Sequence, residues 1–135
     1  MHHRTLVCLT WLIIVTFASG LRLSKLETRP FHADEATGAR ILSQRLAGDY
    51  QFNPNHFHGP LLSLLTEPLA RLRNETTWQS LSIETLRLSP AIAGILICLT
   101  PLLWRRVMGE YGAALSAALL ATSPMLVYYR RMYVH

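Results

Sequence analysis

Residues 5–21 read TLVCLTWLIIVTFASGL, and none of them carries a charge. Two further uncharged runs follow, at residues 88–104 and at residues 111–129. Each run approaches the ~20 residues that an α-helix needs to cross about 30 Å of hydrocarbon. The sequence therefore predicts an all-α membrane protein with three transmembrane helices, at residues 5–22, 88–104 and 111–129.

The composition narrows the class further. Half of the 135 residues are hydrophobic and the mean hydropathy is +0.23, which excludes a disordered tail. The net charge of +5 does not indicate a nucleic-acid partner, because the basic residues flank the apolar runs and no binding motif is present. Cys8 and Cys98 both lie inside apolar runs and show no metal-ligand spacing. Membrane lipids are thus the expected surroundings, and no nucleic acid is expected.

The first run has an alternative interpretation as a secretory signal. Ala18 and Gly20 are small residues that stand three and one positions before a candidate cleavage point after Gly20. The run is longer than the core of about 7–15 residues that signals usually have. A retained helix is therefore favoured, and a secreted or anchored module after cleavage is the alternative.

The arginines orient the chain. Basic residues near helix ends tend to remain in the cytoplasm, and Arg105 and Arg106 follow the second run directly. We therefore expect residues 1–4 and 105–110 in the cytoplasm. Residues 23–87 and 130–135 then lie on the outer face of a multi-pass protein of the cell (plasma) membrane.

The outer interval begins with one predicted surface helix, at about residues 34–47. Two acids open it, where they meet the positive end of the helix dipole, and Gly48 can adopt the left-handed conformation that ends a helix. Ala39, Leu42 and Leu46 are spaced three and four apart and form one apolar stripe. This pattern predicts an amphipathic juxtamembrane helix at the membrane surface.

A second surface helix is predicted at about residues 60–72. Pro60 suits the first position of a helix, and a short leucine-rich segment follows it. The segment carries Glu67 and is interrupted by Pro68, and such short apolar segments are usually interfacial or re-entrant. A full crossing of the membrane is the less favoured alternative.

Charged residues gather on the outer side in this topology. They include the carboxylates of Asp34 and Glu35 and the guanidinium groups of Arg130 and Arg131. The two arginines oppose the usual cytoplasmic preference of basic residues, so they need another reason to be outside. Two guanidinium groups near a carboxylate pair suit an anion, and phosphate matches the arginine fork best.

Histidines add a second candidate chemistry. His32, His56 and His58, together with the two acids, hold enough nitrogen and oxygen for a divalent metal. No spacing among them is diagnostic of a metal site. Contacts with an acceptor or within the loop are therefore favoured, no metal or other cofactor is assigned, and a divalent metal is the alternative.

Six segments occur in an order that resembles a known family. They are Arg29–Ala36, Gly48–Tyr50, His58–Leu61, Leu86–Ala91, Arg105–Gly109 and Ser123–Arg131. The resemblance is to the multi-pass membrane glycosyltransferases of the protein O-mannosyltransferase and aminoarabinose-transferase type, with the GT-C fold. Within that group the chain looks most like the flippase-activity-associated proteins of archaeal N-glycosylation. The resemblance extends from about Leu21 to His135.

The resemblance implies an enzyme that works on the extracytoplasmic face. It implies a sugar donor linked to polyprenyl phosphate and transfer of that sugar to a hydroxyl group. Asp34 matches the family's catalytic base, and Glu35 accompanies it. Arg131 matches an arginine in the region that faces the donor phosphate. Arg130 is assigned to the same phosphate, although the family commonly has serine at this position.

The chemistry of such a transfer needs these residue types. A base must remove the proton of the acceptor hydroxyl, and positive charge must stabilise the phosphate that leaves. Structural interpretations stand beside these roles. Asp34 and Glu35 are also suited to cap the helix that they open. Arg130 and Arg131 are also suited to anchor the chain among lipid headgroups.

Family members have roughly ten or more membrane helices, so we expect this chain to be the N-terminal part of a longer protein and inactive alone. The remaining helices of that protein are then its partners, because three helices cannot enclose a groove for a long lipid. The alternative is a small, non-catalytic multi-pass membrane protein that acts through helix–helix contacts.

Overall fold

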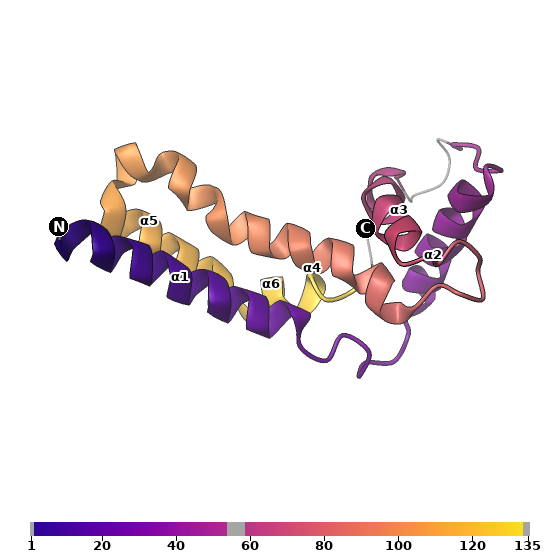
Figure 1. Cartoon of the computed structure of the whole chain (residues 1–135), viewed down its shortest axis with the longest axis horizontal. Helices are drawn as coiled ribbons and strands as arrows, with labels where there is room; N and C mark the ends of the chain where they lie inside the picture. Colours follow the sequence, from indigo (N-terminus) through magenta and orange to yellow (C-terminus); the bar gives the residue numbers. More distant parts are fainter. Residues whose placement is uncertain (1, 54–58, 134–135) are drawn as a thin grey trace. The chain divides into compact units, whose positions relative to one another are not determined.

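The computed structural model describes residues 2–53 and 59–133, with side chains from residue 5 onward. Every regular element among these residues is a helix, which confirms the all-α class. The elements are α1 (His2–Leu23), α2 (Ala33–Ala47), α3 (Leu61–Leu72), α4 (Ile83–Leu99), the 3-10 helix η1 (Thr100–Trp104), α5 (Arg105–Thr122) and α6 (Pro124–Tyr129) (Figure 1).

The chain forms two compact units. The apolar unit comprises residues 1–24 and 91–130, and the loop unit comprises residues 25–90 and 131–135. The apolar unit holds nearly all of the uncharged runs. The loop unit holds the polar interval between the first two runs, together with the last residues of the chain.

Two stretches are long and apolar enough to cross a membrane, Thr5–Leu23 and Ile83–Thr122. The second stretch contains both the run at 88–104 and much of the third run. An unbroken helix of its 40 residues would be about 60 Å long, about twice the hydrocarbon thickness. The backbone leaves helical geometry at Gly109, where φ is 73° and ψ is 166°. The count of three separate spans stays a prediction.

In the apolar unit, α5 packs along α1 (Figure 1). Small side chains make this contact close, and its buried members include Ala18 of α1 and Ala117 and Ala121 of α5. Large apolar side chains of α1 point away from it, and Leu12 and Ile13 are 61% and 67% exposed. An outward surface of this composition suits hydrocarbon rather than water.

An arginine is fully buried in the apolar unit. Arg22, in the last turn of α1, donates hydrogen bonds to the carbonyl oxygens of Ala121 at 3.1 Å, Leu120 at 3.0 Å and Ala18 at 3.4 Å. Leu120 has no helical donor, because the residue four positions later is Pro124, which lacks an N–H group. Arg22 therefore satisfies the carbonyl groups that the α5–α6 break leaves without a partner.

In the loop unit, α2 packs against α3. The core contains Ala39 and Leu42 of α2, Ala70 of α3, Leu86 of α4, and Tyr133. The apolar stripe predicted for the first surface helix is therefore covered by protein and does not face a membrane. α2 ends where expected, because Gly48 adopts φ 83° and its N–H bonds back to the carbonyl oxygen of Arg45.

Candidate functional site

A buried ion pair joins α2 to α4. Arg87 donates from Nε to Oε1 of Glu35 at 2.8 Å and from Nη2 to Oε2 of Glu35 at 2.7 Å. Both side chains are 0% exposed. This two-bond geometry is the strongest that an arginine and a carboxylate make, and it fixes both the distance and the plane of the two groups.

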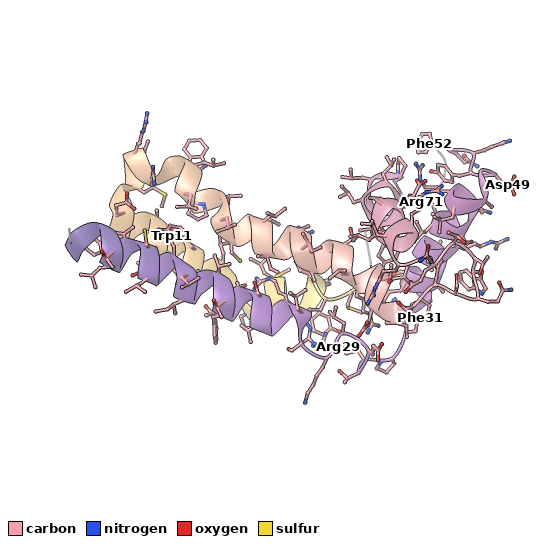
Figure 2. All side chains as sticks on the ribbon, in the orientation of Figure 1. Trp11, Arg29, Phe31, Asp49, Phe52 and Arg71 are labelled. Atoms are coloured by element: carbon pink, nitrogen blue, oxygen red, sulfur yellow. The ribbon has the colours of Figure 1, made fainter. Side chains whose placement is uncertain are left out.

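The same arginine holds the loop that enters α2. Its remaining donors reach the carbonyl oxygens of Leu26, Arg29 and Pro30, at 3.2 Å for Arg29 and 3.1 Å for Pro30. Arg29 lies on this loop, shortly before Phe31 (Figure 2). Arg87 thus ties three parts of the chain together: the incoming loop, the first turn of α2 and the second turn of α4.

Glu35 receives two further hydrogen bonds. The backbone N–H of Tyr133 donates to Oε1 at 2.8 Å, and the backbone N–H of His32 donates to Oε2 at 3.1 Å. Burial by itself would raise the pKa of Glu35, but the hydrogen bonds from Arg87, Tyr133 and His32 lower this pKa below its ordinary value. Glu35 is therefore an ionised carboxylate with its oxygens already occupied.

Asp34 differs sharply from its neighbour. It stands in the first turn of α2 with its side chain 50% exposed, and its Oδ2 lies 3.4 Å from Nδ1 of His32. His32 is the N-cap of α2, and Glu35 completes the capping box. Of the two acids predicted as catalytic, only Asp34 presents its carboxylate at the surface, and Glu35 holds the turn that carries it.

Arg131 lies in the loop unit, near this ion pair. It donates from Nη2 to the carbonyl oxygen of Lys25 at 3.1 Å. Burial, together with the charges of Arg29 and Arg87, lowers the pKa of Arg131. The guanidinium group of Arg131 is thus close enough to those of Arg29 and Arg87 to be affected by their charges, and the charge of Arg87 is paired with Glu35.

Arg130 belongs to the apolar unit, so the two arginines assigned to a donor phosphate fall in different units. The stem of Arg130 lies against Gly94 in α4. A Cβ atom placed on Gly94 would come within 2.8 Å of the Cβ of Arg130 and within 3.0 Å of Nε of Arg22. The close approach of these side chains therefore requires glycine at this position.

Of the three histidines predicted as acceptor or loop contacts, the structure describes His32. His32 is described above, whereas His56 and His58 lie outside the described residues. Within residues 2–53 and 59–133, no group of three His, Cys, Asp or Glu side chains is arranged to hold a metal ion. His32 and Asp34 are close to each other, but two ligands do not make a metal site.

Arg87 and Tyr133 complete the site, and neither was predicted to have a role. A signal for Arg87 exists in the sequence, because a charged residue between Leu86 and Leu88, at the start of an apolar run, is a candidate for pairing with an acid of the polar interval. For Tyr133 no local signal exists, since its contact with Glu35 spans 98 positions.

Comparison of the chain with protein-family models, curated proteins and solved structures found no match. The interpretation of the site therefore depends on its own geometry.

Proposed function

We propose that this chain is part of a membrane glycosyltransferase. The enzyme would transfer a sugar from a polyprenyl-phosphate donor to an acceptor hydroxyl on the extracytoplasmic face of the cell membrane. The observation that carries the proposal is the contrast between two adjacent acids: the side chain of Asp34 is half exposed, while that of Glu35 is fully buried and paired with Arg87. An exposed carboxylate on a rigidly held turn is what a general base requires.

In this proposal, Asp34 removes the proton of the acceptor hydroxyl as its oxygen attacks the anomeric carbon of the sugar. The bond between that carbon and the phosphate oxygen breaks, and the lipid phosphate leaves with the bonding electrons. A single in-line displacement inverts the anomeric centre. Glu35 acts as a positioning residue, because its oxygens already accept hydrogen bonds from Arg87, His32 and Tyr133.

The negative charge that develops on the leaving phosphate needs a cation nearby. Arg131 is assigned this role, and the charge of Arg29 in its vicinity adds to the local positive potential, whereas the charge of Arg87 is paired with Glu35. Arg130 is retained as a second candidate for the same phosphate. His32, next to Asp34, is a candidate contact for the acceptor.

We further propose a multi-pass topology with three spans, at residues 5–22, 88–104 and 111–129. Two stretches long and apolar enough to cross a membrane support this topology, and so does the break at Gly109, which interrupts the longer stretch close to Arg105 and Arg106. A cytoplasmic turn at these arginines satisfies the usual preference of basic residues. The loop unit then lies on the outer face.

The test is an Asp34→Asn variant of the protein expressed from its native reading frame. Transfer of labelled sugar from a polyprenyl-phosphate donor is measured in isolated membranes. Loss of the base should reduce the rate by roughly 10²- to 10⁴-fold. Glu27→Gln is the matched control, since Glu27 is an exposed acid of the loop unit outside the six segments that carry the resemblance, and this variant should keep full activity. Equal activity of the two variants would show that Asp34 is not the base.

The alternative is a non-catalytic membrane protein that acts through helix–helix contacts. The feature that favours it is the row of small residues Ala113, Ala117 and Ala121 on α5, because such rows let helices approach closely. These residues are 0–2% exposed within the chain itself. The small-residue surface is thus already used, which makes the transferase the stronger proposal.

A further inference from the structure

The helix α3 buries small or polar side chains and exposes most of its leucines, which is the reverse of a helix in a soluble domain. The residues that it buries are Ser63, Thr66 and Ala70, which are small or polar. The hydroxyl group of Thr66 donates a hydrogen bond to the carbonyl oxygen of Leu62, one turn earlier on the chain. The hydroxyl group of Ser63 donates in the same way to the carbonyl oxygen of Pro60. Because these hydroxyl groups are paired locally, this face packs against protein without leaving polar atoms unsatisfied.

The opposite face of α3 is apolar and exposed. Leu61, Leu64, Leu65 and Leu72 are 66%, 46%, 51% and 80% exposed, and Pro68 is also exposed. At 3.6 residues per turn these five positions share one stripe about 100° wide. A contiguous apolar surface of this kind marks an interaction site, because soluble monomers rarely leave one uncovered. This surface is called the leucine face below.

Charged groups border the leucine face. Glu67 bridges Arg45 of α2 at 3.2 Å and Arg71 of α3 at 2.8 Å, and Arg71 stays half exposed (Figure 2). Exposed arginine at the edge of an apolar stripe is the arrangement of helices that lie in a membrane interface, where the guanidinium group reaches the headgroups.

The chain itself brings α3 close to a bilayer. Residues 73–82 connect α3 to Ile83, the first residue of a stretch that is long and apolar enough to span. Ten residues reach about 35 Å at most when fully extended, so α3 lies within that distance of the point where this stretch begins. A lipid surface is therefore the apolar phase within reach.

We propose that the leucine face of α3 inserts into the acyl-chain boundary of the bilayer, with α3 lying parallel to the membrane surface. At 12 residues α3 is about 18 Å long and too short to span about 30 Å of hydrocarbon. Its other face stays on the core of the loop unit. The inference is independent of the proposed transferase; if both hold, α3 fastens the unit that carries Asp34 to the surface where a lipid phosphate resides.

Site-directed spin labelling of the full chain tests the proposal. Cys8→Ser and Cys98→Ala remove the native thiols, and single cysteines are then introduced by Leu65→Cys on the leucine face and by Thr37→Cys, an exposed position on α2. Each protein is labelled with a nitroxide and reconstituted in vesicles of phosphatidylcholine and phosphatidylglycerol. Collision rates with apolar oxygen and with a water-soluble nickel chelate report the surroundings of the label.

The ratio of oxygen to nickel collisions should be several-fold higher at Leu65 than at Thr37. Labels at Leu61→Cys and Leu72→Cys should report equal depths, as expected for a helix that lies flat. Equal ratios at positions 65 and 37 would show that the leucine face is in water. Low collision rates with both reagents at position 65 would show a protein cover, and a depth difference between 61 and 72 close to the helix length would show end-on entry; each result would overturn the proposal.

Discussion

At the scale of single residues, adjacent acids have opposite surroundings because of helix geometry. Successive residues of a helix point about 100° apart. When Glu35 faces the core and meets Arg87, Asp34 must point elsewhere, and it points to the surface. Burial of this ion pair costs free energy of folding, because both charged groups lose their hydration. It orders the loop before α2, the first turn of α2 and Tyr133 at the same time.

Removal of Arg87 should therefore cost more than removal of an exposed arginine. Arg87→Ala leaves the Glu35 carboxylate buried without its cation, which typically costs about 3–5 kcal/mol. Thermal unfolding in detergent micelles, followed by circular dichroism, measures the loss. Arg40→Ala, at an exposed position of α2, is the control and should unfold like the native chain.

A double variant separates the ion pair from general damage. In Arg87→Leu with Glu35→Gln neither charge remains, so part of the lost stability should return. If Arg87→Ala alone unfolded at the native temperature, the ion pair would not hold the loop unit.

The lowered pKa of Glu35 predicts how stability depends on pH. A carboxylate whose pKa is depressed in the folded state stabilises that state at pH values above its unfolded pKa. This contribution should be fully present above the ordinary value of 4.5 and should disappear as the pH falls through the lower, folded-state pKa. Unfolding free energies measured between pH 7 and pH 3 should fall more steeply for the native chain than for Glu35→Gln. Parallel curves would contradict the prediction.

At the scale of the elements, the α5–α6 break shows how a helix can end inside an apolar unit. Pro124 removes one backbone donor, and Ser123, at φ −56° and ψ 116°, turns the chain out of helical geometry. Carbonyl groups that are buried among apolar side chains are out of reach of water, so another helix must supply their donors. Arg22 of α1 supplies the donors, which makes a charged residue part of the packing between α1 and α5.

Arg22→Ala should destabilise the apolar unit. It leaves the carbonyl groups of Leu120 and Ala121 without a donor, at about 1–3 kcal/mol for each group. Thermal unfolding in micelles measures the effect, and Arg106→Ala, an exposed arginine of the same unit, should be nearly neutral. Adding Pro124→Ala to Arg22→Ala restores an N–H group for Leu120 and should recover part of the stability. No recovery would argue against the capping role.

At the scale of the whole molecule, the polar interval forms a unit of its own. The chain leaves the apolar unit after Ser24, builds the loop unit, and returns to the apolar unit after Pro90. It enters the loop unit again at Arg131, and Tyr133 is then fully buried in the core there. The last described residues thus hold together a unit whose other members come far earlier in the chain.

Most of the helical segments could be predicted from the sequence, but not the break at Ser123 that divides the third uncharged run between α5 and α6. Uncharged runs become helices because a helix satisfies its backbone within the segment, so only local composition matters. Gly48 ends α2 for an equally local reason, since glycine adopts positive φ without strain. The amphipathic pattern of residues 34–47 also predicted a helix, but the pattern does not say whether protein or lipid covers the stripe.

The sequence by itself determined the all-α class, the three uncharged runs and the presence of acids at the start of α2. Only the tertiary structure decided that Glu35 pairs with Arg87, 52 positions away, that Arg22 caps the α5–α6 break, and that the leucines of α3 face outward. The physical reason is the range of the interactions. Hydrophobicity and backbone conformation act within a few residues, whereas the partner of a buried charge is chosen by how distant segments pack.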